Sequence, residues 1–145
     1  MGIMNAHRIR LRGPWKIYVE KNGVQTEFQT SLPSDCHVIQ QLISPFTGQL
    51  TGEILLCRRR FHSPTNLQKT DEIRLEVKSS CLPGELFLND AKRLDFEENA
   101  SCEITSGLQQ VNEVQVAFSL PEFFKLSSHV SIWESVELEI RSDDD

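Results

Sequence analysis

The chain has 145 residues, of which 39% are hydrophobic and 25% are charged, and its formal net charge is −6 at pH 7. This length predicts a single domain with a core of its own and excludes a catalytic α/β barrel, which needs about 250 residues. The negative charge argues against nucleic acid and anionic membranes as partners, because both attract positively charged surfaces.

The N-terminal segment and the cysteines predict a cytoplasmic address. Residues 1–13 are basic and lack the apolar stretch of a secretory signal. No apolar run reaches the ~18 residues that cross a membrane. No two cysteines have the close spacing of a zinc site, so we expect free thiols, no metal and no cofactor. The four cysteines are Cys36, Cys57, Cys81 and Cys102.

The first predicted element is a β-hairpin. Trp15, Ile17 and Val19 alternate with polar or mixed residues, and a second alternating run starts at residue 24. An Asn-Gly pair, here Asn22-Gly23 between the two runs, favours the positive φ angles that a tight hairpin turn requires.

A short helix is predicted next. Ser34 or Asp35 is a suitable N-cap, and the apolar residues that follow have helical spacing. Pro45 ends the segment, because the residue before a proline avoids the helical region. Residues 46–52 are predicted as a loop.

The rest of the chain alternates between short strands and loops. Predicted strands cover residues 53–61, 72–78, 85–88, 102–105, 112–118 and 132–140. The polar residues 91–101 and the segment 121–131 are expected to be loops. This pattern predicts an all-β protein, an antiparallel β-sandwich or barrel, and periodicity alone does not choose its topology. We place the domain at residues 1–141 and a disordered acidic tail at 142–145.

Several segments together resemble a known domain in sequence and order. They are LRGPW (11–15), RRFHSP (59–64), LFLNDAKRL (86–94), CEITSGL (102–108), NEVQV (112–116) and IWESVELEI (132–140). This set resembles the N-terminal sugar-binding domain of family 2 glycoside hydrolases, the β-galactosidase and β-glucuronidase group. The resemblance implies a jelly-roll sandwich of the galactose-binding-like type over roughly residues 9–141.

The resemblance also implies what the chain lacks. In these hydrolases the catalytic carboxylates lie on a separate barrel, so the sandwich alone implies a non-catalytic, carbohydrate-binding role. The loops that approach the barrel in the family correspond here to about residues 37–52 and 119–131. Neither stretch contains an evident equivalent of the family's sugar-contacting Asn or Asp.

Sugar binding by a sandwich needs exposed aromatic rings beside polar groups. The residues in or near the two loops that fit this description are Phe46, Gln49, Glu122, Phe124, His129 and Trp133. The alternatives are structural: Phe123 and Phe124 as a plug at one end of the sandwich, and the two tryptophans, Trp15 and Trp133, as core or rim residues. Exposure of Trp133, Phe124 and Phe46 around a cleft would favour the sugar.

Other site chemistry has weaker support. Glu97 and Glu98 are neighbours in a polar loop, whereas a glycosidase holds two carboxylates at a set separation in a cleft. The acidic loop that contains them has no strict calcium-binding spacing. Strand alternation sends Arg59 to the opposite face from Arg58 and Arg60, so we expect no continuous basic patch.

A protein-interaction domain on the same scaffold is the second hypothesis. Residues 1–60 carry 8 Lys/Arg and 4 Asp/Glu, a net charge of +4, whereas residues 61–145 carry 7 and 17, a net charge of −10. Such asymmetry is typical of some partner surfaces. The expected partner is therefore a carbohydrate or a separate protein.

Overall fold

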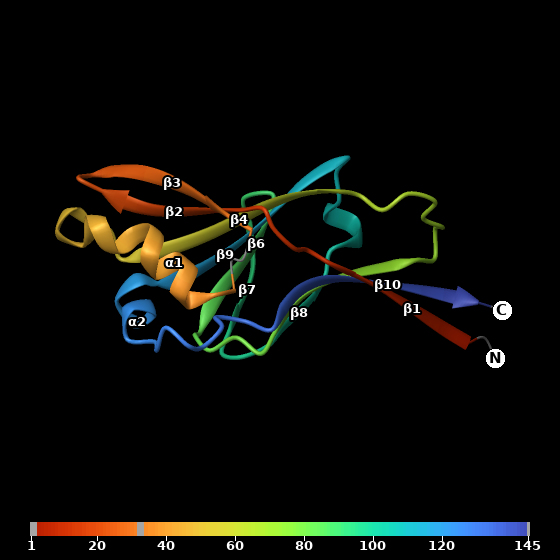
Figure 1. Ribbon diagram of the computed structural model, residues 1–145. Helices are drawn as coiled ribbons and strands as arrows, with labels where there is room; N and C mark the ends of the chain where they lie inside the picture. Colours follow the sequence, from red (N-terminus) through yellow and green to blue (C-terminus); the bar gives the residue numbers. More distant parts are fainter. Residues whose placement is uncertain (1–2, 32–33, 145) are drawn as a thin grey trace.

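The computed structural model describes residues 3–31 and 34–144. Within these residues, ten strands form two antiparallel sheets that pack face to face as a sandwich (Figure 1). The four-stranded sheet has the order β1-β10-β5-β8, formed by Ile3–Arg10, Ser135–Asp144, Glu72–Lys78 and Ala100–Glu103. The six-stranded sheet has the order β3-β2-β4-β9-β6-β7, formed by Val24–Thr30, Trp15–Lys21, Ile54–His62, Val111–Ser119, Gly84–Leu88 and Ala91–Phe96. The predicted all-β sandwich is confirmed.

Both hairpin turns of the six-stranded sheet follow from the local sequence. Asn22 and Gly23 have φ angles of 51° and 79° and join β2 to β3, as predicted. Asn89 and Asp90 have φ angles of 50° and 67° and join β6 to β7. Asn and Asp tolerate the left-handed region better than most side chains, which explains both turns.

Strand β7 was not expected from the sequence, which predicts a loop over residues 91–101. Only Phe96 is buried in this strand, and its other residues are half-buried or exposed. An edge strand with so few buried positions has little hydrophobic alternation to detect, and here the turn at Asn89-Asp90 brings it back along β6.

The structure places residues 142–144, which were predicted as part of a disordered tail, in strand β10. Ser142 and the two residues after it belong to β10 and pair with residues 3–5 of β1. Strand β1 supplies the backbone hydrogen-bond partners of these polar residues. The sequence of a short charged segment does not show that such a partner strand exists, so the strand could not be predicted. Asp145 lies outside the described residues.

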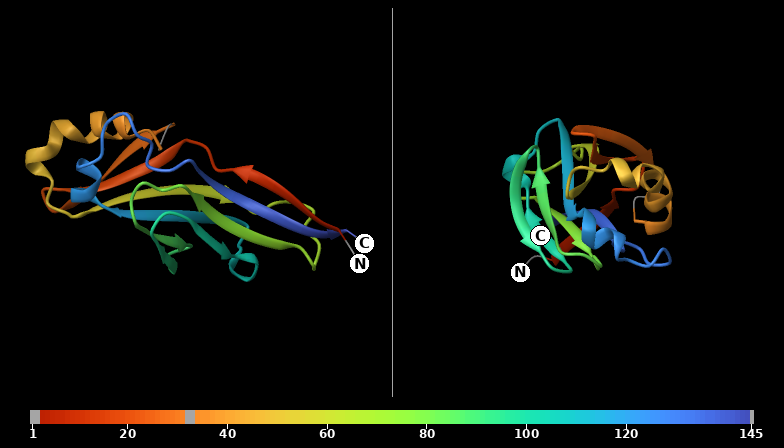
Figure 2. Two further views of the ribbon diagram at one scale, coloured as in Figure 1. Left: turned by 90° about the horizontal axis from the view of Figure 1, so that it is seen from below. Right: turned by 90° about the vertical axis from the view of Figure 1, so that its left-hand side faces the viewer.

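Both α-helices lie at one end of the sandwich, away from the short 3-10 helix η2 (Thr105–Gly107) (Figure 2). Helix α1 (Cys36–Ile43) begins at Asp35, whose carboxylate accepts hydrogen bonds from the backbone N–H groups of His37 and Val38. A 3-10 helix, η1 (Ser44–Gln49), follows α1 and covers part of the segment 46–52 that was predicted as a loop. Pro45 lies in its first turn, where proline is tolerated. Helix α2 (Leu120–Phe124) occupies the start of the predicted loop 121–131.

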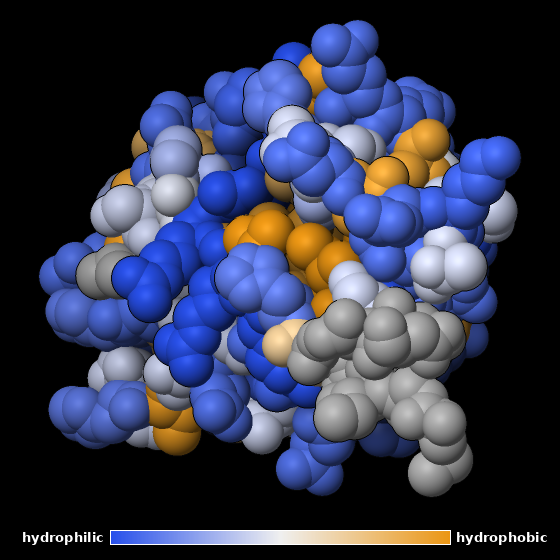
Figure 3. Space-filling view, turned by 90° about the vertical axis from the view of Figure 1, so that its right-hand side faces the viewer, coloured by the Kyte–Doolittle hydropathy of each residue, from blue (hydrophilic) through white to orange (hydrophobic). Residues whose placement is uncertain are grey.

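Strand β1 begins and strand β10 ends at the opposite end. Figure 3 shows that this end is largely polar, with an apolar patch at its centre.

An aromatic cluster lies in the core, formed by Trp15 of β2, Phe118 of β9 and Trp133 in the segment before β10. The ring centroids of Trp15 and Trp133 are 5.2 Å apart, and those of Phe118 and Trp133 are 6.0 Å apart. Trp133 is only 3% exposed, and the Trp15 indole N–H donates to the Leu11 carbonyl at 3.0 Å. The structural alternative for the two tryptophans is therefore correct in the sense that both are buried.

We expect Trp133→Ala to lower the free energy of unfolding by about 3–5 kcal/mol, because the substitution leaves a cavity between the sheets. Phe124→Ala is the control, since Phe124 is 37% exposed, and it should cost less than about 1 kcal/mol. Urea denaturation followed by far-ultraviolet circular dichroism measures both. Equal losses in the two variants would contradict the buried position of Trp133.

Candidate functional site

The outer face of the six-stranded sheet carries an apolar strip. Strand alternation turns Leu55 and Cys57 of β4 into the core, so Ile54 and Leu56 face outward. Cross-strand pairing then places Tyr18 beside Leu56, Leu56 beside Ala117, and Ala117 beside Glu85.

These residues form a groove with a volume of about 430 Å³. Its apolar floor runs across β4 and β9, and an aromatic residue lies on each side, Tyr18 from β2 and Phe87 from β6. Ile54 is 57% exposed at one end of the floor. The groove lies within the size range of small-ligand sites, about 300–1,000 Å³. We call it the outer groove.

Polar groups surround the apolar floor. Gln115 lines the outer groove and donates through its amide nitrogen to Asp90 at 2.9 Å and to Glu113 at 2.8 Å. These contacts fix the amide at one orientation. Glu20, Gln25, Glu53 and Glu85 also line the groove. The floor therefore offers an apolar surface, and its edge offers hydrogen-bond acceptors and donors.

The Tyr18 hydroxyl is held in place. It donates to the Glu27 carboxylate at 2.7 Å, and the Arg58 guanidinium lies 4.7 Å from the centre of the Tyr18 ring. Burial, together with the neighbouring Glu27 carboxylate, raises the pKa of Tyr18 above its ordinary value of 10.0. The hydroxyl is therefore protonated at neutral pH and the ring has a fixed orientation.

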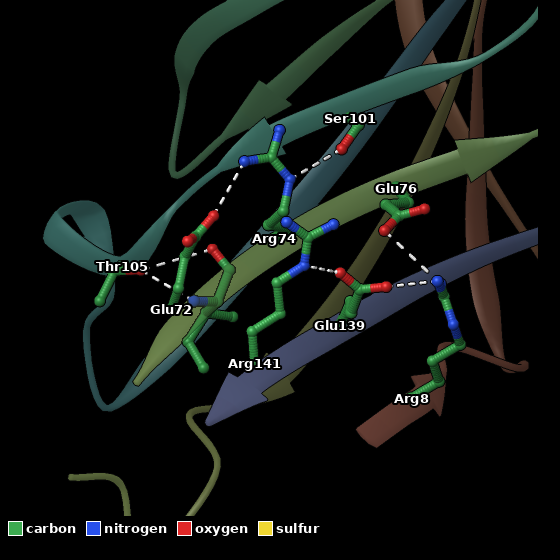
Figure 4. Close-up of polar contacts among 9 residues, drawn as sticks. Arg8, Glu72, Arg74, Glu76, Ser101, Thr105, Glu139 and Arg141 are labelled. Atoms are coloured by element: carbon green, nitrogen blue, oxygen red, sulfur yellow. Dashed lines mark hydrogen bonds and ion pairs between the residues drawn. The ribbon is translucent and has the colours of Figure 1, made fainter. Parts of the chain in front are cut away.

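The outer face of the four-stranded sheet has a different character, because it is covered by ion pairs (Figure 4). Glu139 is 2% exposed and accepts from both Arg8 and Arg141. Arg8 also lies 3.5 Å from the Glu76 carboxylate. The charged groups of this cluster contact one another.

A second ion-paired carboxylate lies beside the first on β10. Glu137 is 4% exposed, is 3.1 Å from the Lys78 ammonium and accepts from the Ser135 hydroxyl at 3.0 Å. Burial alone would raise the pKa of both carboxyl groups. The Lys78 and Ser135 contacts outweigh it at Glu137, and Arg141 and Arg8 outweigh it at Glu139, so both pKa values lie below the ordinary 4.5.

The two loops expected to meet at one end of the sandwich do lie side by side. The Gln40 side-chain amide in α1 donates to the Leu126 carbonyl after α2 at 3.2 Å, and the backbone N–H of Ile132 donates to the Ser34 carbonyl at 2.6 Å. This arrangement places both loops at the helical end (Figures 1 and 2).

The ligand-binding residues predicted from these loops lie in different parts of the described structure and do not surround one cleft. Trp133 is buried in the core, so its ring offers no surface to a ligand. Phe46 packs against Phe28, with 5.7 Å between ring centroids, and lies under the Lys21 ammonium. The Gln49 side chain accepts from Asn22 at 3.2 Å in the same region.

The other predicted residues lie around α2. Glu122 forms an ion pair with Lys125 at 2.9 Å, and the Phe124 ring packs against the buried Phe123, which fits the predicted plug at this end. His129 is exposed. Ligand binding by these surface residues remains a prediction.

Sequence reasoning missed the outer groove, although a signal for it was present. Phe87 lies between Leu86 and Leu88, and Leu56 follows Leu55, so in each strand one large apolar residue must face outward. Tyr18 lies between the inward residues Ile17 and Val19 in the same way. Large apolar residues at outward positions of neighbouring strands indicate a surface site.

The cysteines, the possible metal ligands and the helices of the described residues each bear on a prediction from the sequence. All four cysteines are free thiols, as predicted. Burial raises the pKa of Cys57 to about 12, and burial together with Cys81 and Asp35 raises the pKa of Cys36 to about 11. Among residues 3–31 and 34–144, no three His, Cys, Asp or Glu side chains are placed to hold a metal ion. No helix in this part of the chain is long and apolar enough to cross a membrane.

Comparison with known proteins identifies the fold. No protein-family model matches this chain, and no curated protein does. An FMN-binding β-glucuronidase from Faecalibacterium prausnitzii L2-6 matches with a TM-score of 0.65 and 16% identity, over 93% of this chain and 22% of that one. The chain has the fold of one part of a β-glucuronidase.

Two further solved structures agree. Another β-glucuronidase from Faecalibacterium prausnitzii has a TM-score of 0.69 and 10% identity, over 93% of this chain and 31% of that one. The Ruminococcus gnavus enzyme in complex with uronic isofagomine has a TM-score of 0.64 and 16% identity, over 97% of this chain and 30% of that one. This chain spans less than a third of the length of each. The resemblance in fold predicted from the sequence is confirmed.

We expect the ion-paired carboxylates to make the fold acid-sensitive. Because the pKa values of Glu137 and Glu139 are lower in the folded chain than the ordinary 4.5, their stabilisation is complete above that pH and is lost as the pH falls through the folded values. Glu139→Gln should lower the urea midpoint at pH ~7 and reduce the further loss between pH ~4.5 and pH ~3.

The matched control is Glu97→Gln, at an exposed position in the loop after β7. It should leave the urea midpoint at neutral pH and the acid sensitivity unchanged. A Glu139→Gln variant with the pH dependence of the unmodified protein would contradict the assignment.

Proposed function

We propose that this chain is a non-catalytic carbohydrate-binding domain and that the outer groove holds the saccharide. The observation that carries the proposal is the groove itself, an apolar floor between Tyr18 and Phe87 with a polar edge. Sugar rings have apolar C–H faces that pack on aromatic rings, and hydroxyl groups that need hydrogen-bond partners. The resemblance to the sugar-binding domain of family 2 glycoside hydrolases supports the same class of ligand.

The non-catalytic part of the proposal rests on the environment of the groove carboxylates. A glycosidase needs one carboxylic acid kept protonated by its surroundings and a second carboxylate at a set separation. Glu20 and Glu53 are exposed, and Glu85 forms an ion pair with Lys92 at 3.3 Å. Solvated or ion-paired carboxylates favour hydrogen bonding to hydroxyl groups over proton transfer.

A protein-interaction role is the second candidate, and one observation favours it. Ile54 is 57% exposed beside the half-buried Leu56, and an exposed aliphatic side chain also suits a protein partner. The polar edge and the two aromatic residues favour the saccharide. A cytoplasmic address is part of the proposal, because free thiols are typical of reducing compartments.

The test begins with a glycan array and continues with calorimetric titration of the neutral oligosaccharides that bind. Phe87→Ala should weaken binding about tenfold or more, because it removes one aromatic side of the groove. Phe124→Ala is the matched control, an exposed phenylalanine at the helical end, and should leave the affinity unchanged. Thermal unfolding confirms that both variants fold.

Each outcome separates the alternatives. A loss in Phe124→Ala but not in Phe87→Ala would move the site to the helical end and its sequence-predicted residues. No binding across a broad array of neutral and charged glycans would overturn the carbohydrate proposal.

A further inference from the structure

A basic pocket adjoins the outer groove on the same face of the six-stranded sheet. It has a volume of about 340 Å³ and is lined by Pro14, Lys16, Tyr18, Arg58, Arg60 and Glu113, together with Arg59. Tyr18 lines both hollows, so they share a wall. A concentration of cations is unusual in a chain with a net charge of −6.

Arg59 lines the same pocket as Arg58 and Arg60, although strand alternation predicts that its side chain points to the opposite face. Pairing of β2 with β4 extends only to Lys16 and Arg58, and beyond that point β4 has no strand on this side. The Arg59 guanidinium donates to the Arg12 carbonyl and, at 2.8 Å, to the Arg60 carbonyl. The three arginines therefore line one pocket despite the strand alternation.

The carboxylates in contact with the pocket do not balance its cations. Glu113 lies 3.9 Å from Arg58 and 3.8 Å from Arg60, and Glu27 lies 3.4 Å from Lys16. Four cations therefore face two carboxylates, and the contacts of Glu113 are long. The buried Nε of Arg58 has no hydrogen-bond partner. An excess of positive charge in a pocket favours an anionic group.

We infer that this pocket binds a tetrahedral oxyanion, a sulfate ester or a phosphate monoester, carried by the saccharide in the outer groove. The inference rests on the proposed function for its saccharide part. Lys16 approaches from β2 and the arginines approach from β4, so donors come from several directions. A tetrahedral oxyanion presents three oxygens to such a set, whereas a planar carboxylate is satisfied by one guanidinium fork.

The cross-strand register connects the pocket to the groove. Lys16, Arg58, Gln115 and Phe87 occupy consecutive positions across β2, β4, β9 and β6. Phe87 is two strands from Arg58, roughly 10 Å at the usual strand spacing. The acidic residues Glu20, Glu53 and Glu85 line the groove, whereas the cations lie in the pocket. This separation of charge places the anionic group of the saccharide in the basic pocket and its neutral part in the outer groove.

The test compares one oligosaccharide backbone in neutral, sulfated, phosphorylated and uronate forms, by calorimetric titration of the full chain. The sulfated or phosphorylated form should bind about tenfold more tightly than the neutral form, and added salt should reduce this difference. Arg60→Gln, at a side chain that is 78% exposed, should remove the difference and leave the affinity for the neutral form unchanged. Arg10→Gln, an exposed arginine on the other sheet, is the matched control and should change neither affinity.

Inorganic sulfate and phosphate test the pocket without a saccharide. At matched ionic strength, each should raise the thermal midpoint above that in chloride, and Arg60→Gln should abolish the rise. If these ions bind while no neutral oligosaccharide does and Phe87→Ala has no effect on sulfated ones, the proposed function fails and the anion pocket stands. If neutral oligosaccharides bind and sulfation or phosphorylation adds nothing, the pocket inference fails and the proposed function stands.

Other results would also overturn the inference. Uronate binding equal to that of the sulfated form would remove the tetrahedral preference. An equal loss in Arg60→Gln and Arg10→Gln would show a general effect of net charge. Tighter binding of a single-stranded oligonucleotide than of any sulfated or phosphorylated saccharide would assign the pocket to a nucleic-acid backbone.

Discussion

The register of β4 between β2 and β9 is the constraint on which both faces of the six-stranded sheet depend. Its inward residues, Leu55 and Cys57, fill the core beside the aromatic cluster, and its outward residues, Ile54 and Leu56, form the floor of the outer groove. A slip of one residue would exchange these two sets, because side chains alternate along a strand. Core burial therefore fixes the groove as well, since the same register serves both faces.

The point at which the pairing of β2 with β4 ends also shapes the surface of the six-stranded sheet. β2 leaves β4 at Lys16, where the chain turns through Pro14 and Gly13. A Cβ atom on Gly13 would overlap the backbone of Ser31, so glycine is required for this close approach. Beyond this point the Arg59 guanidinium donates to the carbonyl of Arg12, in the segment that leads into β2.

The two outer faces of the sandwich contrast in how their polar groups are used. On the four-stranded sheet, Glu137 and Glu139 are paired with cations from neighbouring strands, and this network stabilises the sheet. On the six-stranded sheet, apolar area and the side-chain amide of Gln115 line an open groove. A face whose charges already contact one another has few groups left for binding, so the open face is the better candidate for function.

The amino-acid sequence alone predicts the fold class, the hairpin at Asn22-Gly23 and the helix that begins at Asp35, because these depend on side-chain alternation and on local turn and capping chemistry. It did not reveal β7 or the last residues of β10, whose pairing partners lie elsewhere in the chain. The outer groove also needed the tertiary structure. Tyr18, Leu56 and Phe87 are far apart in sequence, and only the cross-strand register brings them to one surface. Trp133 is a different case, since its position near a loop allowed either a ligand-binding or a core role, and packing against Trp15 and Phe118 buries it.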